Sequence, residues 1–118
     1  MARAETPSER RQLLVESVVA HRKGGDEAIV FEGVDRPVEY DDQRLRLELD
    51  ADERDRLDSL LSEYHVFKIK QPETRKADDG VVYLSAVTDP KHAADFIEAL
   101  FRDVYAAAKT YELRVRDT

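Results

Sequence analysis

Three histidines are the side chains in this sequence best suited to acid–base chemistry or metal binding near neutral pH. His21 stands in a His-Arg-Lys-Gly-Gly run that could hold an anion, but the helix dipole also favours cations at the C-terminal end of a helix. His65 shares one side of a predicted strand with Phe67, which is typical of a half-buried core residue. His92 follows Asp89 by three residues, yet Asp89 is better explained as a helix cap, and two ligands make no metal site.

Other signatures of catalysis or cofactor binding are missing from the chain. It has no cysteine, which excludes disulfides, thiolate metal sites and cysteine nucleophiles. It has no Gly-x-Ser-x-Gly motif, and its four glycines form neither a phosphate-binding loop nor a dinucleotide-binding turn. The carboxylate pairs at 41–42 and 78–79 flank predicted turns, where Asp is common for backbone reasons. We therefore predict no cofactor and no metal, and the sequence favours a non-enzymatic protein.

The charge balance limits the classes of partner. Nineteen Lys and Arg against 26 Asp and Glu give a formal net charge of −7 and a pI near 5.0, which argues against nucleic acid and an anionic membrane surface as partners. Thirteen of the cations are Arg, and Asp outnumbers Glu by 14 to 12. An acidic, Lys-poor surface suits a salt-rich cytoplasm, and a GC-rich genome is the alternative explanation.

No targeting segment or membrane span is expected. The N-terminal residues lack the apolar region of a secretion signal. The longest nearly apolar stretch, residues 81–87, is about a third of the length that a membrane helix needs. We therefore expect a cytoplasmic protein.

Caps and periodicity predict three helices. Thr6 and Pro7 begin the first, with apolar residues at helical spacing behind them and a glycine pair at 24–25 to end it. Asp50 caps the second helix, which extends to about residue 64. Asp89 and the following proline begin the third, whose apolar stripe extends to residue 104.

Short runs with period-two alternation predict strands at residues 28–31, 37–40, 44–49, 65–70 and 81–87, with an optional strand at 111–116. Residues 44–49 alternate strictly between charged and apolar side chains, which is typical of a half-buried antiparallel strand. Pro37 indicates an edge position for its strand, and the apolar run at 81–87 indicates a central one.

These elements predict one two-layer α+β domain over residues 1–118, with three helices and an antiparallel sheet of five to six strands in the order α-β-β-β-α-β-β-α(-β). The order of elements resembles the fold of type III secretion chaperones. This likeness is topological, rests on no motif, and does not determine a function.

A weak charge asymmetry suggests where partners bind. Residues 1–25 carry five cations and three acids, whereas the rest of the chain has a net charge of −9. A basic first helix could contact a phosphate backbone or the acidic face of a second copy. The polar loop at 71–80 is the other candidate contact segment. The predicted interaction surface consists of Arg10, Arg11, His21, Arg22, Arg75, Lys76 and Arg102.

Two segments, residues 14–22 and 88–105, resemble a family of small, acidic, uncharacterised haloarchaeal proteins. The resemblance covers about a quarter of the chain and rests mostly on apolar helix positions. Within it, His21-Arg22 and Phe101-Arg102 are polar positions that stand among apolar matches. The resemblance implies a cytoplasmic haloarchaeal setting, and it implies no activity, cofactor or catalytic residue.

Three hypotheses follow. The first is a non-enzymatic protein–protein interaction module of a halophile that forms a homodimer or binds another protein. The alternative is a regulator that responds to a ligand or a nucleic acid through the basic first helix. The third is a small enzyme with a cleft between the third helix and the loop at residues 71–80.

Overall fold

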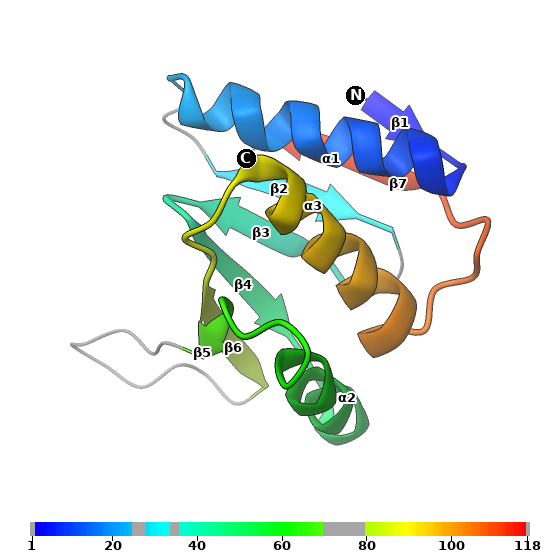
Figure 1. Cartoon of the computed structure of the whole chain (residues 1–118). Coiled ribbons are helices and arrows are strands. Elements are labelled where there is room, and N and C mark those ends of the chain that lie inside the picture. The colour runs from blue at the N-terminus through cyan, green and yellow to red at the C-terminus, as the bar shows by residue number, and fades with distance from the viewer. Residues whose placement is uncertain (1, 25–27, 34–35, 70–79, 118) are drawn as a thin grey trace.

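The computed structural model describes residues 2–24, 28–33, 36–69 and 80–117. They form an α+β fold in which three α-helices lie in front of one seven-stranded antiparallel sheet (Figure 1). The predicted fold class is confirmed, with one strand more than the sequence indicated. That strand, β1, joins the N-terminus to the sheet.

The helices are α1 (Pro7–Arg22), α2 (Ala51–Leu61) and α3 (Pro90–Ala99). Each begins at the cap that the sequence predicts: the side chains of Thr6, Asp50 and Asp89 accept a hydrogen bond from the backbone N–H three residues later. This hydrogen bond lowers the pKa of the Asp89 carboxyl, because it stabilises the ionised form.

A π-helical turn, η1 (Leu100–Val104), follows α3 without a break. The N–H of Tyr105 bonds to the carbonyl of Leu100, five residues back. Within the turn, Leu100, Phe101 and Val104 are all fully buried. Periodicity did not predict η1, because a single wider turn leaves the stripe of apolar positions nearly unchanged.

The strands are β1 (Ala2–Ala4), β2 (Ile29–Glu32), β3 (Val38–Asp41), β4 (Arg44–Glu48), β5 (Lys68–Ile69), β6 (Val81–Ser85) and β7 (Leu113–Asp117). Their order in the sheet is β1-β7-β2-β3-β4-β6-β5. The optional last strand is therefore real and lies inside the sheet between β1 and β2. The two ends of the chain are brought together there.

Two positional predictions were wrong. The strand after Pro37 is an interior strand, because Pro37 lies before β3 and all four residues of β3 can pair with β4. The predicted strand at 65–70 is described only as the short β5. His65 lies in the turn before β5 and is exposed, so it is no core histidine.

One face of the sheet forms the core with the helices. Inward positions alternate along each strand, and the central ones are fully buried, as in Val38 and Tyr40 of β3 and Leu45 and Leu47 of β4. Helices α1 and α3 pack side by side over this face (Figure 1). The other face of the sheet has no described helix on it.

Candidate interaction surface

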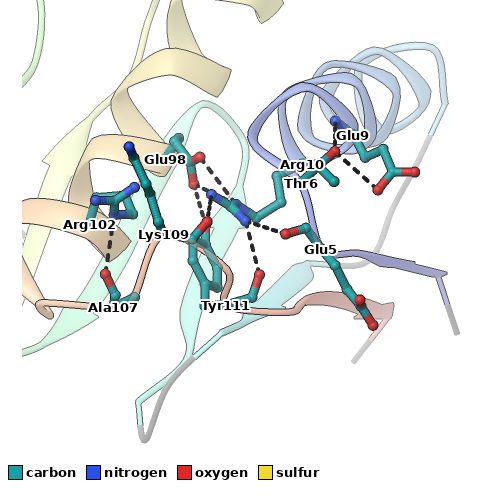
Figure 2. Close-up of polar contacts among 9 residues, drawn as sticks. All are labelled: Glu5, Thr6, Glu9, Arg10, Glu98, Arg102, Ala107, Lys109 and Tyr111. Atoms are coloured by element: carbon teal, nitrogen blue, oxygen red, sulfur yellow. Dashed lines mark hydrogen bonds and ion pairs between the residues drawn. The ribbon is translucent and has the colours of Figure 1, made fainter.

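Arg10 was predicted to lie on an interaction surface, but its side chain is fully buried, and the prediction was wrong. Its Nε donates to both carboxylate oxygens of Glu98 at 3.1 Å. Its Nη atoms donate to the backbone carbonyls of Glu5 (2.8 Å), Tyr111 (3.0 Å) and Lys109 (3.0 Å) (Figure 2). The guanidinium also lies 4.1 Å from the centre of the Tyr111 ring. Arg10 therefore joins α1, α3 and the segment before β7.

The burial of Arg10 has a signal in the sequence. It stands four residues before Leu14 and eight before Val18, which are the buried positions of α1. Its partner Tyr111 is also buried. Burial raises the pKa of the Tyr111 hydroxyl well above its usual range, and the hydrogen bond to the Glu98 carboxylate raises it further.

Arg11 and Arg102 also contact other parts of the fold. The Nε of Arg11 donates to the Asp95 carboxylate of α3 at 2.8 Å, with both side chains about half exposed. The Nε of Arg102 donates to the carbonyl of Ala107 at 3.1 Å. Arg10 and Arg102 thus bind the same segment between η1 and β7 (Figure 2). Arg11 and Arg102 remain accessible in part, whereas Arg10 does not.

His21 and Arg22 pack against the hairpin formed by β3 and β4. The Nε2 of His21 accepts the N–H of Asp42 at 3.4 Å and lies 3.5 Å from the Asp41 carboxylate. Its Nδ1 is buried and has no hydrogen-bond partner among the described residues. Arg22 donates to the Tyr40 hydroxyl at 3.3 Å and to a backbone carbonyl just before α3. This end of α1 therefore fastens the helix to the sheet.

The predicted residues do not form one surface. Arg10 and Arg102 lie near the C-terminal end of α3. His21 and Arg22 are the last residues of α1 and lie against the hairpin of β3 and β4. Arg75 and Lys76 fall outside the described residues.

A different surface emerges on the uncovered sheet face, by which we mean the outward positions of β1 to β7. Its basic side chains are Arg3, Arg44, Arg46, Lys68, Arg114 and Arg116. Its acidic side chains are Glu32, Glu39, Asp41 and Glu48. In a chain of net charge −7, this face has more cations than acids.

Most of these cations have no ionic partner. Arg116 donates to Glu32, and Arg114 lies 3.8 Å from Glu112. Within the part of the chain that the structure describes, no ion pair involves the other four basic residues of this face, Arg3, Arg44, Arg46 and Lys68. Unpaired arginine on a flat surface is available to contact a partner.

Apolar and aromatic groups complete the uncovered sheet face. Val30 lies at its centre and is almost fully buried, between Arg116 and Glu39 in the register. Tyr83 lies on β6 opposite Arg46. The sequence held a signal for this face, because the alternation noted in β4 returns in β7 with two arginines.

Two exposed valines lie at one end of this face, where β6 ends and β5 begins. Val66 is 46% exposed and Val87 is 64% exposed, and they are the exposed large apolar side chains among the described residues. Each is two residues from the paired residues Lys68 and Ser85. Exposed apolar groups at a sheet margin are a feature of contact surfaces.

The described residues give little support to the other classes of site. An open hollow of about 210 Å³ between α2 and η1 is lined by Arg56, Ser59, Leu60, Glu63 and Asp103, a set without a histidine. In the described ranges, no three side chains of the metal-binding types converge. None of the described helices has both the length and the apolar character to cross a bilayer.

His92, the residue considered for metal binding, packs among aromatic rings. Its ring stacks on Phe67 at 5.4 Å between ring centres and lies 5.8 Å from that of Tyr64.

Comparison with known proteins places the chain in a family. No curated protein and no solved structure matches it. One family model matches it over residues 1–118, the full length of the sequence. The chain belongs to this family, the family of unknown function DUF7975.

Proposed function

We propose that this protein is a protein–protein interaction module whose contact surface is the uncovered sheet face. The observation that carries the proposal is that, within the described residues, no ion pair involves Arg3, Arg44 or Arg46. These arginines lie on the same face as Tyr83, and no described helix covers that face. Tyrosine and arginine are enriched at the centres of protein interfaces, where they supply most of the binding energy. The exposed side chains of Val66 and Val87 extend this surface at one end.

The basic first helix offers less to a partner. The alternative of a regulator that binds nucleic acid used the first helix and its His21-Arg22-Lys23 end, with Arg10, Arg11 and Arg22 as contact residues. Of these three arginines, Arg10 and Arg22 donate to groups inside the fold, and Arg11 pairs with Asp95 at the surface. On the uncovered sheet face, four carboxylates stand among the six cations. Such a mixture repels phosphates at some positions and suits a protein surface of mixed charge.

The same proposal includes a setting, the salt-rich cytoplasm of a halophile. It is supported by the acidic net charge and by the low share of lysine among the cations. If the protein comes from such a cytoplasm, its free energy of unfolding rises between about 0.15 M and about 2 M KCl, because salt screens the repulsion among carboxylates. Urea titrations at the two concentrations measure this change, and a fall in stability contradicts the setting.

Photocrosslinking in cells tests the interaction itself. Tyr83→benzoylphenylalanine places a reactive aromatic group on the uncovered sheet face, and Ala20→benzoylphenylalanine places it on the exposed side of α1 as the control. We expect crosslinked polypeptides from position 83 and few from position 20. Absence of adducts at position 83, equal adducts at both positions, or adducts that nuclease removes would refute the proposal.

A further inference from the structure

We propose that the partner is a second copy of this chain, docked sheet to sheet about a two-fold axis that runs along the strands between β3 and β4. This inference rests on the proposed function, since it uses the same uncovered sheet face. It adds the identity of the partner and the geometry of the contact.

The charges of the two central strands carry the inference. The outward side chains of β3 are acidic, Glu39 and Asp41, and their direct neighbours on β4 are basic, Arg46 and Arg44. In these two rows the boundary between β3 and β4 separates negative from positive charge, and Glu48, the third outward charge of β4, lies outside them. None of these four residues forms an ion pair with another of them in the described structure, and the Asp41 carboxylate lies 3.5 Å from His21 Nε2 of α1.

A two-fold axis along this boundary exchanges the two sides of the sheet. It places β3 of one copy opposite β4 of the other and leaves positions along the strands unchanged. Glu39 then faces Arg46 of the second copy, and the symmetry forms this contact twice. Sheets pack about 10 Å apart, a distance that these two long side chains bridge together.

The next strands outward fit the same axis. β2 lies beside β3 and β6 lies beside β4, so the axis brings β2 of one copy over β6 of the other. Val30 and Tyr83 occupy the same cross-strand row as Glu39 and Arg46. The axis thus places the Tyr83 ring of each copy over the Val30 position on β2 of its partner, where the valine side chain itself is already buried within one copy.

The charges also disfavour the other face-to-face arrangement. A two-fold axis perpendicular to the strands places β3 over β3 and β4 over β4. When that axis passes through the row of Glu39 and Arg46, or between this row and that of Asp41 and Arg44, carboxylates meet carboxylates and arginines meet arginines. Like charges repel across a desolvated contact, so these rows favour the axis along the strands.

Charge exchange between copies tests this geometry. Glu39→Arg and Arg46→Glu each create like charges across the axis, and we expect each variant alone to dimerise at least about tenfold more weakly than the wild type. An equal mixture of the two variants restores opposite charges across the axis. In a dimer of Glu39→Arg alone, the introduced arginine faces the native Arg46 of the second copy. In the mixed dimer, it faces the glutamate introduced at position 46. In the mixed dimer, position 39 and position 46 of facing copies carry opposite charges at both contacts. The double variant, Glu39→Arg with Arg46→Glu, restores them as well.

The mixture separates contact between copies from folding. Glu39 and Arg46 are also neighbours within one copy, so each single variant keeps its internal like charges when the two are mixed. Recovery of the dimer in the mixture therefore arises only between copies. Arg54→Glu, on the exposed side of α2, is the control and leaves dimerisation unchanged.

Sedimentation and light scattering of the full chain, at about 0.1 mM protein and in both about 0.15 M and about 2 M KCl, give the oligomeric state. The inference is supported if the wild type is a dimer, each single variant dimerises more weakly, and the mixture of the two recovers the dimer. A wild-type dimer that is indifferent to the two charge variants overturns it, and so does a monomer at both salt concentrations. If a monomer still crosslinks another protein through position 83, the proposed function stands without this inference; if it crosslinks none, both fall.

Discussion

Removal of the Arg10 side chain tests whether the buried guanidinium holds the fold together. In Arg10→Ala, the Glu98 carboxylate loses its cation, and the carbonyls of Glu5, Lys109 and Tyr111 lose a donor. Glu98 keeps only the hydrogen bond from the Tyr111 hydroxyl. The change therefore acts on α1, α3 and the segment before β7 together.

The magnitude follows from the burial of the pair. Arg10 is 0% exposed and Glu98 is 21% exposed, so the ion pair is largely withdrawn from water. Removing one partner of a buried ion pair costs about 3–5 kcal/mol, because the other charge stays behind without compensation. Because Glu98 is partly exposed to water, the expected loss of unfolding free energy is about 3 kcal/mol, at the lower end of this range. This is a large part of the roughly 5–15 kcal/mol that stabilises a typical domain.

The neighbouring arginine provides a matched control. Arg11 has one ion pair, with Asp95, and both side chains are about half exposed, so Arg11→Ala should cost about 0–1 kcal/mol. Urea unfolding followed by circular dichroism measures both variants. A loss in Arg10→Ala no larger than that in Arg11→Ala would show that the buried contacts do not stabilise the fold.

Two further predictions concern the same region. Burial raises the pKa of Tyr105 and Tyr111 in the folded protein, so their contribution to stability is present below their unfolded pKa of about 10 and is lost as the pH rises above it. Urea midpoints between about pH 9 and about pH 11 should fall less steeply in Tyr105→Phe/Tyr111→Phe than in the wild type, and equal slopes contradict the assignment. In Gly33→Ala, the new Cβ would lie 2.6 Å from the Tyr111 ring, so we expect a loss of about 1–3 kcal/mol by the same urea assay, and an unchanged midpoint rejects it.

Most of the fold was predictable because its signals are local. The caps at Thr6, Asp50 and Asp89 and the alternation of β4 each depend on a few consecutive residues, and all were found where predicted. The elements that the sequence did not predict, β1 and η1, lacked such local signals. β1 is only three residues long, and it is a strand because β7 supplies its partner.

The prediction of the interaction surface was less accurate, because burial of a charged side chain depends on contacts with residues far away in the sequence. Exposure of a charged side chain was inferred from its residue type, but Arg10 shares the phase of Leu14 and is buried with Glu98, 88 residues away in the sequence. For residues 44–49 the alternation predicted a half-buried strand, and its charged side chains were not included in the predicted interaction surface. Only the sheet order shows that Glu39 and Arg46 lie side by side at the centre of the uncovered sheet face.

The sequence by itself determined the α+β class, the helix starts and the acidic balance, since composition, caps and periodicity are properties of short segments. The tertiary structure decided which arginines are buried and which remain on a surface. It also decided that β7 enters the sheet between β1 and β2, and that no described helix lies on one of the two sheet faces. These features arise from contacts between residues far apart in the chain, whose pairing is settled only when the whole core is packed.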